Sequence, residues 1–133
     1  MVIRALDDLL VYQKALTAAD AGSAILERPG LAKDFELKGQ LGASSSRVAA
    51  LISEGFEQKT DHHFAHYLYI ARGSAKETTT HLLIAEGRRY TTADETKNLC
   101  GPYYEIAKML TGLIQHLERE DRPHRWKTSR LND

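Results

Sequence analysis

The sequence predicts an all-α protein folded as an antiparallel up-down four-helix bundle. Only three prolines occur in 133 residues. Apolar residues recur with helical rather than alternating spacing in four long stretches, and the connections between these stretches are short. Four amphipathic helices of roughly 20 to 28 residues with short connections pack as an antiparallel bundle.

The first predicted helix covers residues 5–27. Its apolar positions have helical spacing and are Leu6, Leu9, Leu10, Leu16, Ala19 and Leu26. Asp7 and Asp8 stand in the first turn, where the helix dipole favours negative charge. Arg28-Pro29-Gly30 is predicted to end this helix, because the residue before a proline avoids the α region and glycine tolerates left-handed geometry.

The second helix is predicted over residues 33–58. Its stripe follows 4-3-4-3-4 spacing and contains Leu37, Leu41, Ser44, Val48, Leu51 and Gly55. Residues 39–46 (GQLGASSS) are unusually small, and small residues let another helix approach closely. Two interpretations remain open for this segment: tight packing inside the bundle, or contact with another subunit.

The third helix is predicted to begin after Thr60, a good N-cap residue, and to end near Glu86 with Gly87 as its stop. Its apolar face consists of Phe64, Tyr67, Leu68, Ala71, Ala75, Leu82 and Ala85.

The fourth helix is predicted from the capping-box pattern of Thr92 and Glu95 to about Glu120. Its stripe of Leu99, Tyr103, Ile106, Leu110, Leu113 and Leu117 repeats in steps of 4 and 3, which is typical of helices packed at about +20°. The stripe continues in phase past Pro102, so we expect a local distortion near Asn98 rather than a helix end.

These elements divide the chain into a bundle of residues 1–120 and a basic tail of residues 121–133. Lysine and arginine together number 18, as do aspartate and glutamate, so the net charge is zero. Binding to nucleic acid would therefore need a local basic patch. The single cysteine, Cys100, excludes an internal disulfide and fits a reducing cytoplasm. No apolar run approaches the ~20 residues of a membrane span, and no secretion signal is evident.

Two basic patches are candidate nucleic-acid contacts. Arg88 and Arg89 precede Tyr90 at one end of the bundle, and the tail carries Arg122, Arg125 and Lys127 around Trp126. Cations beside aromatic rings suit phosphates and stacked bases. The alternative interpretation is a solvated charged end.

The segment of residues 51–75 holds the other candidates. His62 and His66 lie four residues apart on one helix face and could share a metal ion, but without the glutamate of an H-E-x-x-H pattern we predict no metal site. Glu54 and Arg72 are expected to pair across the corner between the second and third helices. In this corner, Gly55 and Gly73 are expected to allow close helix approach.

Several short segments in order also match one family. They are Leu10-Val11-Tyr12-Gln13-Lys14-Ala15-Leu16, Gln40-Leu41, Glu54-Gly55-Phe56, Phe64, Tyr67-Leu68-Tyr69-Ile70-Ala71, Gly73-Ser74-Ala75, Glu77, Met109-Leu110, Gly112-Leu113-Ile114 and Leu117. With these residues the chain resembles the small four-helix bundle proteins encoded in intervening sequences of bacterial 23S rRNA genes, the S23 ribosomal protein-like family.

The resemblance implies a ring-like homo-oligomer, a pentamer, with no established enzymatic activity. A distant relative of the family resembles the accessory subunit of diversity-generating retroelements, which works with nucleic acid. This chain departs from the family pattern at Gly42-Ala43, where the family has two arginines, at Leu51, where it has asparagine, and at Glu57-Gln58-Lys59, which replace arginines. The departures remove positive charge.

Together these observations predict a cytoplasmic, bacterial, non-enzymatic binding or scaffold protein that associates with itself and needs no cofactor. Two alternatives remain: a nucleic-acid-binding accessory protein that uses RNA or DNA contacts at its basic end or tail, and a metal-dependent enzyme at His62 and His66. No nucleophile stands beside a histidine and an acid in a recognisable pattern.

Overall fold

The computed structural model describes residues 5–119, and within this range all regular structure is helical. The predicted all-α class is therefore confirmed for this part of the chain. The elements in order are the 3-10 helix η1 (Leu6–Asp8) and the α-helices α1 (Leu10–Leu26), α2 (Pro29–Lys33), α3 (Phe35–Phe56), α4 (Asp61–Gly87) and α5 (Ala93–Leu117).

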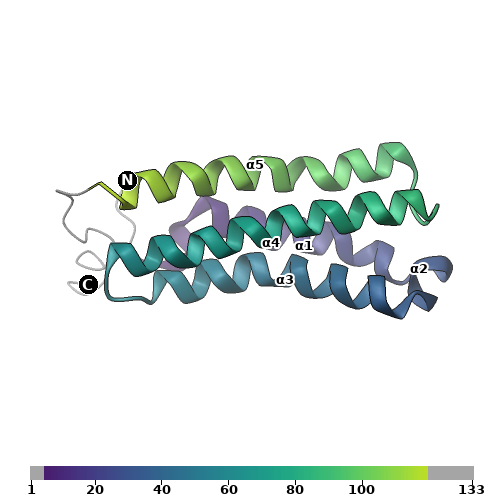
Figure 1. Ribbon diagram of the computed structural model, residues 1–133, viewed down its shortest axis with the longest axis horizontal. Coiled ribbons are helices and arrows are strands. Elements are labelled where there is room, and N and C mark those ends of the chain that lie inside the picture. The colour runs from purple at the N-terminus through teal and green to yellow at the C-terminus, as the bar shows by residue number, and fades with distance from the viewer. Residues whose placement is uncertain (1–4, 120–133) are drawn as a thin grey trace.

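The four long helices lie side by side, and each runs opposite to the next one along the chain (Figure 1). Helix α1 packs against α3 and α5, and α4 packs against the same two helices more extensively. The start of α1, the α3–α4 corner and the end of α5 share one end of the molecule (Figure 1). The short helix α2 and the α4–α5 connection occupy the other end. Between residues 5 and 119 no helix combines the length with the apolarity needed to cross a membrane.

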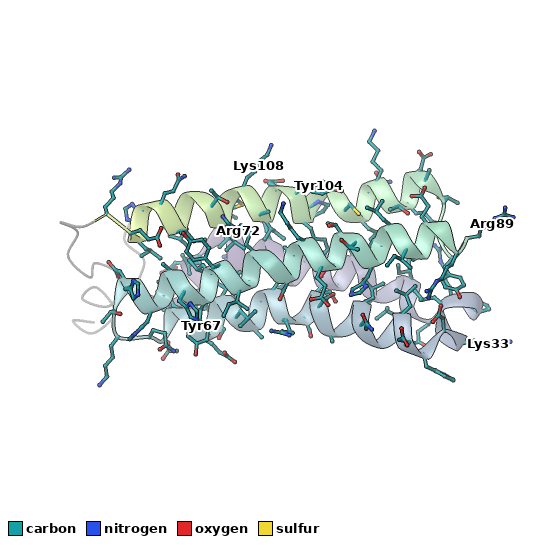
Figure 2. All side chains as sticks on the ribbon, viewed as in Figure 1. Lys33, Tyr67, Arg72, Arg89, Tyr104 and Lys108 are labelled. Carbon is teal, nitrogen blue, oxygen red and sulfur yellow. The ribbon has the colours of Figure 1, made fainter. Side chains whose placement is uncertain are left out.

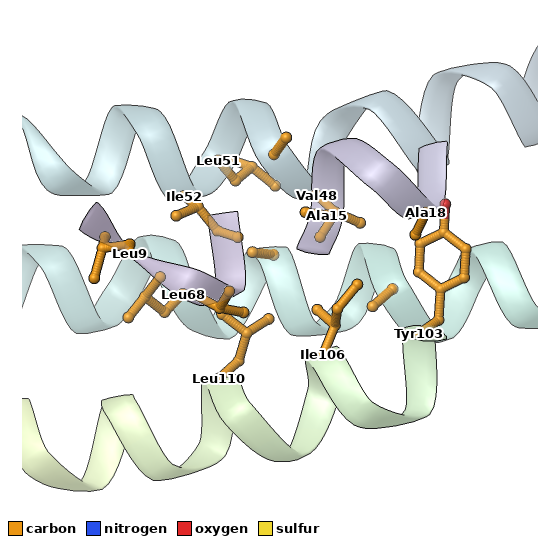
Figure 3. Packing of buried hydrophobic residues seen from close by; sticks show 14 of the residues in the cluster. Leu9, Ala15, Ala18, Val48, Leu51, Ile52, Leu68, Tyr103, Ile106 and Leu110 are labelled. Carbon is orange, nitrogen blue, oxygen red and sulfur yellow. The ribbon is translucent and has the colours of Figure 1, made fainter. Parts of the chain in front are cut away.

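The interior is filled by aliphatic and aromatic side chains from all four long helices (Figure 3). Ile52, Leu68, Ile106 and Leu110 are fully buried at its centre. Burying a side chain of this size stabilises the fold by about 1.5–3 kcal/mol, so the inward faces of these helices supply most of the driving force for packing.

Of the apolar positions predicted for the first helix, Leu9 is buried and Leu6 and Leu26 border the core, but others face outward. Leu10 and Leu16 are 55% and 45% exposed. The residues of α1 that are buried are Val11, Ala15, Ala18 and Ile25. Leucines and alanines occur all around this helix, and its inward face is set by contact with α3 and α5. Small side chains at Ala15 and Ala18 let α1 lie close to its neighbours.

The second predicted helix begins differently from the prediction. Pro29 starts the short helix α2, because a proline at the first helical position lacks only an N–H that would be unpaired there. Helix α2 ends before Asp34, which has non-helical backbone geometry (φ −87°, ψ 77°). The Asp34 carboxylate accepts a hydrogen bond from the Leu37 N–H and caps α3. The predicted stripe of α3 is buried along its whole length.

The start of α4 is as predicted and its last residue is one beyond the predicted Glu86, but Gly87 is not the stop. The Thr60 hydroxyl accepts a hydrogen bond from the His63 N–H. The helix continues through Gly87, and Arg89 is the residue with left-handed geometry (φ 65°). The Tyr90 N–H donates to the Ala85 carbonyl and the Arg89 N–H to that of Glu86. This pair of bonds is a Schellman motif with arginine at the position that usually holds glycine.

Helix α5 has both reciprocal hydrogen bonds of the predicted capping box between Thr92 and Glu95. It continues through Pro102, as predicted, and its last residue is Leu117, slightly before the predicted end. The predicted stripe is buried at Tyr103, Ile106, Leu110 and Leu117, but not at its other two positions. Cys100 and Ile114 are buried, whereas Leu99 and Leu113 only border the core.

Candidate functional site

The basic end around Arg88 is largely neutralised by acidic partners. Arg88 donates to Asp34 with 2.7 Å between Nη1 and Oδ2, and the Tyr90 hydroxyl donates to the same oxygen at 2.8 Å. Arg28 forms a two-pronged ion pair with Glu95 and also donates to the Tyr90 carbonyl. Of the predicted pair, Arg88 is therefore engaged in holding α3 to the α4–α5 connection. Arg89 is exposed and projects from this end (Figure 2).

These contacts also shift the acidity of both carboxyl groups. The hydrogen bond from Tyr90 lowers the pKa of Asp34, with further help from the Leu37 N–H and Arg88. The hydrogen bond from Arg28 lowers the pKa of Glu95 to about 2. The ionised forms are favoured because each carboxylate accepts several donors. This cluster is a structural network that joins three segments at one end of the molecule.

The other predicted basic patch, made of Arg122, Arg125 and Lys127, lies outside the described residues, as does the predicted tail of residues 121–133. Both stay predictions.

The corner between α3 and α4 depends on Gly55. A Cβ atom at this position would lie 2.8 Å from the Tyr67 Cβ and 3.0 Å from the Phe64 Cδ1. The rings of Phe56 and Phe64 meet edge to face, with centroids 6.0 Å apart. Close approach at Gly55 is thus part of the packing between the two helices.

The predicted pairing of Glu54 with Arg72 is wrong. Arg72 lies on the side of α4 that faces α5, where it donates to the Thr111 hydroxyl with 2.9 Å between Nη1 and Oγ1. Its guanidinium also sits 5.0 Å from the centre of the Tyr69 ring. Glu54 is exposed on α3. The expectation for Gly73 also fails within the chain, because no atom would come within 4 Å of a Cβ there.

His62 and His66 are both exposed. The His62 ring lies beside that of His63, and the His66 ring meets Tyr67 edge to face. Residues 5–119 contain no group of three or more histidine, cysteine or acidic side chains placed to hold a metal ion. The two histidines therefore form part of the polar surface of the first turns of α4.

Sequence reasoning missed a groove between α4 and α5, which we call the cationic groove. It has a volume of about 430 Å³ and is lined by Arg72, Lys76, Ala107, Lys108 and Thr111. Figure 2 shows Arg72 and Lys108 on these two helices. No local sequence pattern signals this cluster, because Lys108 lies more than 30 residues from Arg72 and Lys76 in the chain and meets them only in the folded bundle.

A second missed feature is the exposed face of α4, which we call the α4 seam. Its residues repeat in steps of 4 and 3, and all are exposed: His66, Ile70, Gly73, Glu77, Thr80, Ile84 and Gly87. The spacing could have been found in the sequence, but the stronger repeat on the buried face of the same helix hides it.

Several buried polar groups lie inside the bundle. His81 is 8% exposed, and its Nε2 lies 3.1 Å from a Glu77 oxygen. Burial raises the pKa of Tyr103 to about 12 and also raises the pKa of the Cys100 thiol. These shifts favour the neutral forms, so neither group is prepared to act as a base or nucleophile.

The fold and these features define a small helical-bundle protein whose distinctive chemistry is on its outer surface. The model of the family described as 23S rRNA-intervening sequence protein matches residues 7–112, and the chain belongs to this family. The resemblance seen in the sequence is thereby confirmed.

A solved structure from Bacteroides thetaiotaomicron supports the fold. It is described as a protein of unknown function from the S23 ribosomal protein family. The two structures superpose with a TM-score of 0.73 at 24% sequence identity, over 80% of this chain and 99% of the other. At this identity the similarity supports the fold alone. A search of curated proteins found no match to this chain.

Proposed function

We propose that this protein is a non-enzymatic scaffold whose antiparallel four-helix bundles associate with one another into a closed ring. The observation that carries the proposal is the α4 seam. A repeat in steps of 4 and 3 is the pattern by which helices pack against each other, and here it lies on an exposed face. From His66 to Gly87 the seam is about 32 Å long at 1.5 Å per residue.

The composition of the seam favours another helix as its partner. Ile70 and Ile84 provide apolar side chains, and Gly73 and Gly87 leave room for a close approach. Lysine and arginine are absent from the seam. Its one charged residue, Glu77, already contacts His81 on the same helix.

The complementary surface that we propose is on α3 of a second copy. Gly39, Ala43, Ser46 and Ala50 are all exposed, and they repeat in steps of 4, 3 and 4. Isoleucines from one copy would fit against small residues of the next. A contact between two different surfaces repeats around a ring when the rotation closes. Such a contact would build the ring expected for the family and, with five copies, the predicted pentamer.

Light scattering coupled to size-exclusion chromatography tests the proposal. Five copies of the 14.9 kDa chain would give a mass of about 75 kDa. Ile70→Lys combined with Ile84→Lys should reduce the mass to that of a monomer, because lysine places charge in the seam. Leu16→Lys on α1 is the matched control, since Leu16 is an exposed leucine away from the seam, and it should leave the mass unchanged.

The possible results separate the alternatives. A wild-type monomer would contradict self-association, and a dimer of about 30 kDa would contradict the ring. If only Leu16→Lys dissociated the oligomer, the subunit contact would be assigned to α1 instead of α4. Circular dichroism of each variant establishes that the helices are intact.

The structure gives no support to an enzyme at His62 and His66, whose side chains stand on an open surface. The cytoplasmic location also remains a proposal. It is compatible with the single free cysteine, which is buried in α5.

A further inference from the structure

We propose that the cationic groove between α4 and α5 binds the phosphates of single-stranded nucleic acid. The groove brings together the positive charges of Arg72, Lys76 and Lys108. Among residues 5–119, none of these three side chains forms an ion pair with a carboxylate. The proposal concerns a surface separate from the α4 seam.

This cluster is distinctive because three cations without an ion pair in the described part of the chain share one hollow. Lys14, Arg28, Lys38 and Arg88 each pair with an acidic residue from another helix or connection. Those pairs neutralise the charge that they bring to the surface. In the cationic groove like charges share one hollow, and like charges repel unless an anion lies between them. The groove is therefore a local positive site on a chain with no net charge.

Arg72 is held in place before any ligand arrives. Thr111 accepts its hydrogen bond at 2.9 Å from α5, while the Tyr69 ring lies beneath the guanidinium at 5.0 Å. Arginine has five N–H donors, so donors remain for a phosphate after the bond to Thr111. A fixed guanidinium loses less side-chain freedom on binding than a free one.

The shape of the surface favours a polymer over a single small anion. A second hollow of about 580 Å³ lies between the same two helices, and its lining includes Leu83, Tyr104, the cation Lys97 and the carboxylate of Glu86. Tyr104 is 54% exposed and lies near Lys108 on α5 (Figure 2). An aromatic face beside cations is the combination that binds a base and its backbone phosphates. Phosphates would lie over Arg72, Lys76 and Lys108, and a base would stack on Tyr104.

Fluorescence anisotropy with labelled single-stranded oligonucleotides of about 12 nucleotides tests the inference on the full chain. With three phosphate contacts, the logarithm of the association constant should fall linearly with the logarithm of the salt concentration, with a slope of about −2. Lys76→Gln combined with Lys108→Gln should weaken binding at least tenfold and bring the slope to about −0.7. Lys33→Gln is the matched control, because Lys33 is an exposed cation on α2 at the far end of the bundle.

Two further measurements distinguish base stacking on Tyr104 from simple binding of a small anion in the groove. Tyr104→Ser should weaken binding and Tyr104→Phe should retain it, since only the ring is needed for stacking. Inorganic phosphate tests for a small-anion site. Binding of inorganic phosphate at millimolar concentration, measured by calorimetry, together with no binding of the oligonucleotide would overturn the nucleic-acid assignment. The groove assignment would also be overturned if Lys33→Gln weakened oligonucleotide binding and the double lysine variant did not.

Light scattering on the same variants should show an unchanged mass. A failure of the nucleic-acid proposal can therefore be distinguished from a failure of the proposed self-association.

Discussion

The hydroxyl oxygens of Thr78 and Ser44 lie 2.9 Å apart inside the bundle, where they connect α4 to α3. Both residues are 1% exposed. Thr78 also lies within hydrogen-bonding distance of the Ser74 carbonyl in its own helix. This contact explains part of the small-residue segment at 39–46: Ser44 serves packing inside the bundle, whereas Gly39, Ala43 and Ser46 face outward.

A double-mutant cycle measures this contact. Ser44→Ala should lower the free energy of unfolding by about 1 kcal/mol, because an intramolecular hydrogen bond is lost. Thr78→Val should cost a similar amount. The double variant should lose less than the sum of the two, with a coupling energy of at least about 0.5 kcal/mol. Urea unfolding followed by circular dichroism provides these values, and strict additivity would show that the two hydroxyls do not interact.

Gly55→Ala should destabilise the protein by about 1–3 kcal/mol, the usual cost of overpacking a core. The added methyl group would lie 2.8 Å from the Tyr67 Cβ, an atom that cannot move without its helix. Gly112→Ala is the control, because Gly112 is exposed on α5 and its added methyl group would have no atom within 4 Å. It should stabilise the helix by up to about 1 kcal/mol. Equal effects of the two substitutions in thermal unfolding would contradict the close approach at Gly55.

Arg89→Gly should raise the melting temperature. Arg89 adopts φ 65° in the Schellman motif that ends α4, a geometry that costs a residue with a Cβ about 1–2 kcal/mol. Glycine avoids this cost but loses more freedom on folding, so the net gain should be up to about 1 kcal/mol. Arg89→Ala keeps the unfavourable geometry while removing the charge, and it should show no gain. A gain from alanine as large as that from glycine would assign the effect to charge.

The ion pair of Arg28 and Glu95 should make stability depend on pH between about 4.5 and 2. The pKa of Glu95 falls from its ordinary value of 4.5 to about 2 in the folded protein. A lowered folded-state pKa stabilises the fold at pH values above 4.5, and this contribution is lost as pH falls through the folded-state pKa.

Glu95→Gln removes this titration and leaves a side chain that can still complete the capping box. Its melting temperature should therefore fall less between pH 4.5 and pH 2 than that of the wild type. Parallel pH profiles of the two proteins, measured by differential scanning calorimetry, would contradict the assignment to Glu95.

Local sequence signals located the helices well. Thr60 and Thr92 cap α4 and α5 as predicted, because an N-cap depends on a side chain and the backbone within three residues of it. The inward face of α3 also followed from the sequence, since its apolar stripe stands out against charged and small residues. The family, too, was evident from the order and spacing of short segments.

Only the tertiary structure decided which faces meet. In α1 the leucines at positions 10 and 16 are exposed while Ala15 and Ala18 are buried, because contact with α3 and α5 sets the orientation of the helix. Arg72 turned toward Thr111 rather than Glu54 for the same reason. The sequence determined the helices and their caps through interactions within a few residues. The structure determined the inward faces, the network at Asp34 and the cationic groove, because these join side chains distant in the chain.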